Sequence, residues 1–305
     1  MDFLYFLESI RIPGLNEAML LITRLGEEFA FLLVAITFFW CVDKYKGYYM
    51  LSVGFLGNIT SQFMKIWFRV PRPWVLDENF TILEQAREAA SGYSFPSGHS
   101  QCAVGVFGSV ANVTRKRWLK WVCVAVCVLV PFSRMYLGVH TPKDVLVGAL
   151  ISLLLVFTLK PLIVDRHKKV IPILLPCMLL LAVAYVCFLK LYTFPEDVDG
   201  AMLDHATENA FTYLGCLAGM SISCLLDEKW IKFPTRAVWW VQVIKVVVGG
   251  ATVMAVKVLL KTPLNDLLGL YWGRASRYFL MVVIAGTLWP LTFRFLSRIG
   301  KKNLE

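Results

Sequence analysis

Charged side chains are scarce in this sequence: they make up 17% of its 305 residues, whereas hydrophobic residues make up 58%. Soluble globular domains contain about 25% charged and about 45–50% apolar residues. The scarcity therefore excludes an ordinary soluble domain. Apolar runs of about 17–25 residues, each long enough to cross a bilayer as a helix, recur along the chain. Because a helix satisfies its own backbone hydrogen bonds in lipid, the sequence predicts an all-α, polytopic transmembrane helical bundle.

Three further absences exclude other classes of protein. The net charge is +10, but the basic residues mostly occupy short loops between apolar runs, which is a topology signal and argues against a nucleic-acid partner. The N-terminal segment contains Asp2 and Glu8 and lacks a basic stretch, so we expect no cleaved signal peptide. The eight cysteines lie in or beside apolar runs without metal-site spacing, so we expect neither a metal site nor a disulfide framework.

The apolar runs predict about nine spans in a single membrane domain covering residues 1–305. Residues 1–13 read as a short amphipathic helix in the membrane interface. The domain is expected to comprise an N-terminal helix and first span (1–47), a core (48–160) and additional C-terminal spans (161–305). The expected spans cover residues 15–40, 48–68, 99–113, 118–132, 145–159, 170–191, 210–226, 239–260 and 278–296.

The distribution of charge between loops predicts how the spans are oriented. More than half of the basic residues and about a quarter of the acidic ones lie in one set of loops and the C-terminal tail. By the positive-inside rule this set faces the cytoplasm together with the C-terminus, and the N-terminus lies outside. The loops in this set are 42–47, 114–120, 160–169 and 227–237.

Polar residues of unusual kinds lie at the ends of successive spans. With the predicted orientation, every one of them falls on the outer face of the membrane. A lysine, two arginines, two histidines, a glycine, a serine and an aspartate together are suited to handling a phosphate group. They are Lys65, Arg72, Ser97, Gly98, His99, Arg134, His140 and Asp144.

Ser97 and Gly98 stand at the predicted start of a helix. A helix N-terminus offers unpaired N–H groups and the positive end of a dipole, which suits a phosphate. Gly98 would let the backbone approach the phosphate oxygens closely. The simpler interpretation, an ordinary capped helix beside a chance histidine, is equally compatible with this stretch taken alone.

Thr141-Pro142 predicts a second helix start, with Asp144 at its third position as a capping acid. A functional interpretation is that Asp144 accepts a hydrogen bond from the ring of His140, which leaves the other ring nitrogen able to attack. The two roles are compatible. Thr262-Pro263 with Asp266 is a similar helix start without a histidine, and we interpret it as structural.

Lys65 and Arg72 supply positive charge for a dianionic group, and arginine can bind two oxygens at once. The alternative is that both side chains extend to the membrane interface, which is the role that we assign to Arg69.

Three blocks of residues together carry a family resemblance. They are Lys65 with Arg72-Pro73, then Pro96-Ser97-Gly98-His99, then Ser133-Arg134 with His140 and Asp144. In order and spacing this pattern resembles the signature of the type-2 phosphatidic acid phosphatase superfamily, without a departure. The blocks and their helices cover about residues 48–160, and we find no motif-level match beyond them.

The resemblance implies a metal-independent, cofactor-free phosphohydrolase with a phosphohistidine intermediate. It implies that His140 is the nucleophile, that Asp144 orients it, and that His99 is the acid and then the base. The groups that would bind the phosphoryl oxygens are Lys65, Arg72, Ser97, Gly98 and Arg134.

The expected substrate is a lipid phosphate or diphosphate, such as phosphatidate or undecaprenyl diphosphate, at the outer face of the cell membrane. Two alternatives remain open. One is a phosphatase for a soluble ester, because the nine-span plan is similar to that of the glucose-6-phosphatases. The other is a transporter or scaffold with a vestigial site. The intact pair of histidines with Asp144 argues against the vestigial site.

Other basic residues leave alternatives open. Lys245, inside an apolar span, either extends to the inner interface or forms an ion pair within the bundle. Four basic side chains are predicted near the outer face. One interpretation is that they attract an anionic head group, and the other is that they neutralise the acidic stretch 196–208. They are Lys257, Lys261, Arg274 and Arg277. The stretch 76–95 predicts a short helix that caps the site, with a solvated loop as the alternative.

Overall fold

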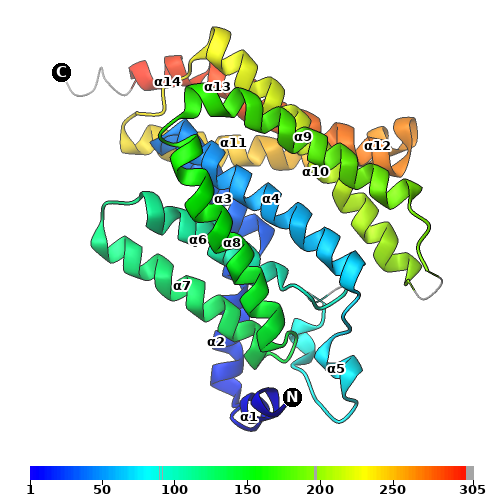
Figure 1. Ribbon diagram of the computed structural model, residues 1–305. Helices are drawn as coiled ribbons and strands as arrows, with labels where there is room; N and C mark the ends of the chain where they lie inside the picture. Colours follow the sequence, from blue (N-terminus) through cyan, green and yellow to red (C-terminus); the bar gives the residue numbers. More distant parts are fainter. Residues whose placement is uncertain (89, 91, 196–197, 300–305) are drawn as a thin grey trace. The chain divides into compact units, whose positions relative to one another are not determined.

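The computed structural model describes residues 1–88, 90, 92–195 and 198–299 (Figure 1). Within these ranges all regular secondary structure is helical and no strand is present, which confirms the predicted all-α fold. The chain forms two compact units. Unit 1 comprises Met1–Ala35 and Tyr49–Asp165, and unit 2 comprises Ile36–Tyr48 and Arg166–Glu305. That both units act as one membrane domain stays a prediction.

The main helix packing in unit 1 is between a short helix and two longer ones. Helix α6 is buried along most of its length and packs against α7 and α8. Its small residues permit this close packing, because Gly105 and Gly108 place no side chain between α6 and its neighbours. The helices are α1 (Asp2–Ser9), α2 (Pro13–Thr23), α3 (Glu28–Thr37), α4 (Lys44–Phe68), α5 (Pro73–Leu76), α6 (Gly98–Val113), α7 (Arg117–Tyr136) and α8 (Pro142–Ile163). The last two residues of α3 and the first five of α4 belong to unit 2.

Helix α1 and the residues just after it pack against the stretch between α4 and α6, within unit 1. Leu4 is almost fully buried in a cluster with Phe80 and Ile82, whereas Phe3 and Phe6 are exposed; the location of α1 in the membrane interface stays a prediction. Arg11, just after α1, donates through Nε to the carbonyl oxygen of Tyr136 and through Nη1 to that of Thr81. In the described part of the predicted cap 76–95, the regular structure after the end of α5 at Leu76 is a 3-10 helix at Glu84–Ala86.

Unit 2 is a separate helical bundle. Its central helix α10 packs against α9 and α12, and the glycines of α10 allow α12 to approach at Ala275 and Phe279. Helix α12 is interrupted at Gly269, where φ is 77°. The helices are α9 (His167–Leu191), α10 (Gly200–Leu226), α11 (Trp239–Leu259), α12 (Lys261–Val283), α13 (Trp289–Leu291) and α14 (Phe293–Ile299).

The contacts of two basic residues in unit 2 bear on the open alternatives. Lys245 is fully buried, and its Nζ donates to the carbonyl oxygens of Pro234 and Thr235, at 3.3 and 3.0 Å, so its described partners are backbone carbonyls of the 227–237 stretch and neither an acid nor the solvent. Arg274 Nη1 pairs with Glu208 at 2.5 Å. Arg274 therefore neutralises an acid at the edge of the acidic stretch.

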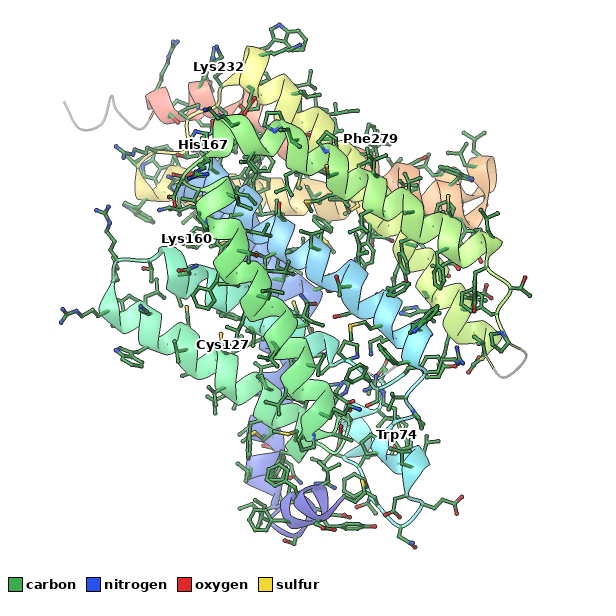
Figure 2. The ribbon with its side chains drawn as sticks, viewed as in Figure 1. Trp74, Cys127, Lys160, His167, Lys232 and Phe279 are labelled. Atoms are coloured by element: carbon green, nitrogen blue, oxygen red, sulfur yellow. The ribbon has the colours of Figure 1, made fainter. Side chains whose placement is uncertain are left out.

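Five described helices are long and apolar enough to cross a membrane, or seven elements if two bent helix pairs each form one span. These seven correspond to all but two of the expected spans. The remaining two, 48–68 and 99–113, form most of α4 and α6. Helix α6 has only 16 residues, and α4 carries several polar side chains. Apart from the first five residues of α4, both lie within unit 1, where Lys160 of α8 and Trp74 of α5 mark opposite ends (Figure 2).

We predict that Gly148→Ala destabilises the protein by about 1–3 kcal/mol, the usual range for overpacking. A Cβ at Gly148 would lie 2.6 Å from the carbonyl oxygen of Ser97, a backbone atom at the start of α6. The measurement is the thermal unfolding midpoint in detergent. Gly108→Ala is the matched control, because its Cβ would meet Val156 at an ordinary 3.6 Å. Equal midpoints for the two variants would contradict the close approach.

Candidate active site

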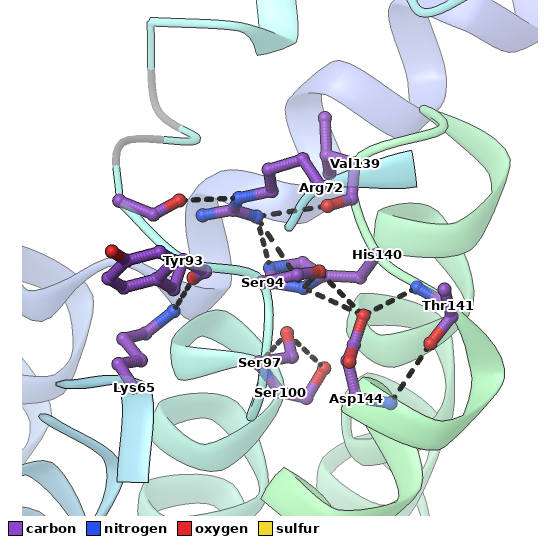
Figure 3. Close-up of polar contacts among 11 residues, drawn as sticks. Lys65, Arg72, Tyr93, Ser94, Ser97, Ser100, Val139, His140, Thr141 and Asp144 are labelled. Carbon is purple, nitrogen blue, oxygen red and sulfur yellow. Dashed lines mark hydrogen bonds and ion pairs between the residues drawn. The ribbon is translucent and has the colours of Figure 1, made fainter. Parts of the chain in front are cut away.

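Four helix ends meet at one end of unit 1 and bring the sequence-predicted site residues together. Figure 3 shows five of these residues, Lys65, Arg72, Ser97, His140 and Asp144. Lys65 lies in the last turn of α4, and Arg134 in the last turn of α7. His99 lies at the start of α6, and Asp144 in the first turn of α8. His140 lies in the connection between α7 and α8.

The start of α6 is built as the sequence predicted. Ser97 is the N-cap, and its Oγ accepts hydrogen bonds from Ser100 N and Oγ at 3.4 and 2.9 Å. The Ser97 N–H donates to the carbonyl oxygen of Asp144 at 2.9 Å, which ties α6 to α8. A Cβ at Gly98 would meet no atom within 4 Å. The position after the cap is therefore open, and a ligand could approach the backbone there.

The start of α8 is also as predicted. The Thr141 Oγ1 accepts from Asp144 N at 3.4 Å, and Asp144 Oδ2 accepts from Thr141 N at 2.8 Å, which forms a complete capping box. Asp144 Oδ2 lies 3.6 Å from His140 Nδ1, which is too long for a hydrogen bond. In place of the expected direct bond, Oδ2 accepts from Thr141 N and from Ser94 Oγ, the latter at 2.6 Å.

Arg72 is buried and does not extend to the membrane interface, since it is only 6% exposed. Its Nε donates to the carbonyl oxygen of Gly92, and its Nη1 donates to that of Val139, both at 2.9 Å. The same Nη1 lies 2.9 Å from His140 Nε2. Burial lowers the pKa of Arg72 to about 10, so the guanidinium stays charged at neutral pH. Lys65 likewise turns inward, and its Nζ donates to the carbonyl oxygen of Tyr93.

Buried donors without partners surround the two histidines. Arg134 is fully buried, and its Nη1 donates to Thr23 Oγ1 at 2.9 Å. Among the described residues, Arg134 Nε and Nη2 and His99 Nε2 have no hydrogen-bond partner. Because a buried polar group without a partner is costly, such a cluster indicates that an anionic ligand completes the site.

His140 is held in its neutral form. Burial is the main cause that lowers its pKa well below 6.5, and the nearby positive charges of Arg72, Arg134 and Lys65 lower it further. A neutral imidazole keeps an unprotonated ring nitrogen, which a nucleophile requires.

Two contributors escaped the sequence analysis. Thr23 reaches Arg134 from α2, 111 residues away along the chain, and no motif or spacing connects them. Ser94 belongs to the polar stretch before α6, but nothing in that stretch indicated that its hydroxyl lies between His140 and Asp144. Within the described part of the chain, no three His, Cys, Asp or Glu side chains form a metal-binding group.

Comparison with known proteins yields two matches to one family. Residues 45–168 match the PAP2 superfamily, and residues 211–302 match the transmembrane extension of PAP2 superfamily phosphatases. The chain is 34% identical over 165 residues to phosphatidylglycerophosphatase B of Bacillus subtilis (strain 168), covering 50% of this chain and 76% of that protein. The chain belongs to the PAP2 superfamily.

Other relatives are similar to about half of this chain. An undecaprenyl-diphosphatase of Bacillus subtilis is 29% identical over 145 residues, covering 47% of this chain and 72% of the relative. Sphingosine-1-phosphate phosphatase 1 of Mus musculus is 26% identical over 148 residues, covering 46% of this chain and 33% of that protein. No solved structure gives a significant match.

Membership in the PAP2 superfamily makes this chain a phosphatase with membrane-spanning helices. The first PAP2 match contains all the predicted site residues. The second lies in unit 2, where the sequence offered no motif, and extends the family relationship over most of the C-terminal half.

We predict that His140 stays neutral throughout the range above pH 6.5. Its pKa lies below the ordinary 6.5, so protonation begins only in more acidic solution. The measurement is an NMR titration of 13C-labelled histidines in the substrate-free protein. The chain has only four histidines, and His140→Ala identifies the signal. A titration midpoint at or above 6.5 would contradict the lowered pKa.

Proposed function

We propose that this protein removes phosphate from a lipid phosphate or diphosphate at the outer membrane face, through a phosphohistidine intermediate. The observation that carries the proposal is the set of buried, unpaired donors of Arg134 and His99 beside the neutral ring of His140. The relatives support the lipid class of substrate, because their names specify phosphatidylglycerophosphate, undecaprenyl diphosphate and sphingosine 1-phosphate.

In the proposed first step, His140 Nε2 attacks the phosphorus and the bond to the leaving oxygen breaks. His99, whose protonated form the bound phosphate anion would favour, gives its proton to that oxygen, so the lipid alcohol, or the shortened lipid phosphate, leaves carrying that proton. In the second step His99 takes a proton from water, and the resulting hydroxide attacks the phosphohistidine. Inorganic phosphate leaves and the His140 ring is restored.

The cations perform the remaining work of phosphoryl transfer, which is to align the group and stabilise its charge. Lys65, Arg72 and Arg134 surround the ring of His140, close enough to lower its pKa. The first N–H groups of α6, where Gly98 leaves an open approach, add the positive end of a helix dipole. Ser97 fixes that helix end through its capping bonds.

We predict that His140→Ala lowers phosphate release by on the order of 10³-fold or more, as loss of a nucleophile does. The assay uses purified protein with phosphatidate, phosphatidylglycerol phosphate, undecaprenyl diphosphate and glucose 6-phosphate. We expect the wild type to prefer a lipid substrate. Hydrolysis of glucose 6-phosphate alone would instead support the soluble-ester alternative.

Two controls accompany this assay. His167→Ala, at the start of α9 in unit 2, should retain wild-type activity. A thermal melt should show that His140→Ala is folded; a folded, fully active variant rules out His140 as the nucleophile. Wild-type activity should also persist in excess EDTA. Complete loss that a divalent metal restores would refute the metal-independent mechanism.

The proposed outer location rests on charge within unit 1. The connection between α6 and α7, and the first turn of α7, contain four basic residues and lie at the end away from the candidate site. Lys160 adds a fifth near the C-terminal end of α8, opposite Trp74, whose ring lies near Arg72 (Figure 2). Basic ends face the cytoplasm, which supports a non-cytoplasmic site. The four residues are Arg115, Lys116, Arg117 and Lys120.

We predict that a membrane-impermeant maleimide labels Glu78→Cys in intact cells and labels Arg115→Cys only after permeabilisation. Both positions are exposed, and they lie toward the two opposite ends of unit 1. The unsubstituted chain, with its eight native cysteines, gives the background signal. The reverse labelling pattern would show that the site faces the cytoplasm.

A further inference from the structure

The hydroxyl of Ser94 lies between the two residues that were expected to contact each other directly. Ser94 Oγ is 2.6 Å from Asp144 Oδ2 and 3.3 Å from His140 Nδ1, whereas Nδ1 and Oδ2 are 3.6 Å apart (Figure 3). We propose that Ser94 is a positioning residue, which fixes the ring of His140 through a hydrogen-bonded relay to Asp144. This inference rests on the proposed role of His140 as the nucleophile.

The direction of the relay follows from which groups can donate. Asp144 Oδ2 also accepts from the backbone N–H of Thr141, so it presents lone pairs to Ser94. Ser94 must therefore donate its single hydroxyl proton to Asp144. Only lone pairs of the hydroxyl remain for His140, so the ring nitrogen that faces Ser94, Nδ1, carries the proton.

Arg72 does not decide the tautomer by itself. Its Nη1 lies 2.9 Å from His140 Nε2 and 3.5 Å from Nδ1, so it is close to both ring nitrogens and adds positive charge beside the ring. The contact with Ser94 therefore assigns the proton to Nδ1, and the lone pair of Nε2 is left for the attack.

Ser94 is itself held in place. Its side chain is fully buried, and its backbone N–H donates to the carbonyl oxygen of Val70 at 2.8 Å. The ring of Phe95, the next residue, packs edge-on against Phe68 at the end of α4. The Ser94 hydroxyl is therefore fixed between the two side chains. It contacts His140 Nδ1, whereas the Asp144 carboxylate caps α8 and lies too far from that nitrogen for a hydrogen bond.

We predict that Ser94→Ala lowers kcat at least about tenfold with little change in KM, the usual effect of losing a partner that orients a reactive histidine. The assay measures release of phosphate from phosphatidylglycerol phosphate in detergent micelles. Ser152→Ala is the matched control, because Ser152 is another fully buried serine of unit 1 that donates a 2.6 Å hydrogen bond, to the carbonyl oxygen of Gln101. Equal kcat values for the two variants would overturn the proposal.

A double-mutant cycle separates the relay from independent effects. If Ser94 acts through Asp144, the kcat of the double variant Ser94→Ala with Asp144→Asn should be within about twofold of the kcat of the slower single variant. If the double variant instead loses kcat by the product of the two single-variant factors, the two residues act separately and the relay is refuted.

A readout without turnover distinguishes this inference from the proposed function. In 15N-histidine spectra of the substrate-free protein, wild-type His140 should be the Nδ1–H tautomer, and Ser94→Ala should populate both tautomers. A wild type that shows this tautomer but hydrolyses none of the lipid substrates would refute the proposed function alone. An unchanged tautomer in Ser94→Ala would refute the positioning role alone.

Discussion

Positive charge buried beside a neutral imidazole is the constraint on which the rest of unit 1 depends. Arg134 is fully buried with two nitrogens unpaired, and Arg72 is nearly as buried. Isolated buried charges are costly, so the surrounding fold must supply partners. Thr23 from α2 and the carbonyl oxygens of Gly92 and Val139 do so. What they leave unsatisfied is a cluster of donors arranged for an anion, and this is the chemistry expected of a PAP2 phosphatase.

Asp144 joins the fold of unit 1 to its chemistry. Its side chain caps α8 and binds Ser94, while its carbonyl oxygen accepts from the N–H of Ser97 at the start of α6. One residue therefore holds two helix ends and one edge of the site. Because the cap of α8 and the bond to Ser94 share the carboxylate oxygen Oδ2, we expect a change of the Asp144 side chain to alter both stability and catalysis, whereas Ser94 offers a way to change the ring orientation with the cap left intact.

Much of this arrangement could be predicted from local sequence. Long apolar runs indicated the spans, because the length needed to cross a bilayer is fixed by its thickness. Ser97 and Thr141 were identified as caps because capping uses residues only a few positions apart. The phosphatase motifs identified the candidate site by order and spacing. The second PAP2 match, over residues 211–302, came from comparison alone, since unit 2 carries no chemical motif.

The sequence by itself determined the helices, their caps and the kinds of residue at the candidate site. Only the tertiary structure decided which atoms meet. Thr23 contacts Arg134 from 111 residues away, and Ser94 reaches Asp144 from 50 residues away, in the place where a direct bond between His140 and Asp144 was expected. Such contacts depend on how separate helices pack. Helix capping depends on residues within one turn of each other in the sequence. The partner of a buried hydroxyl or guanidinium depends instead on which distant element packs against it.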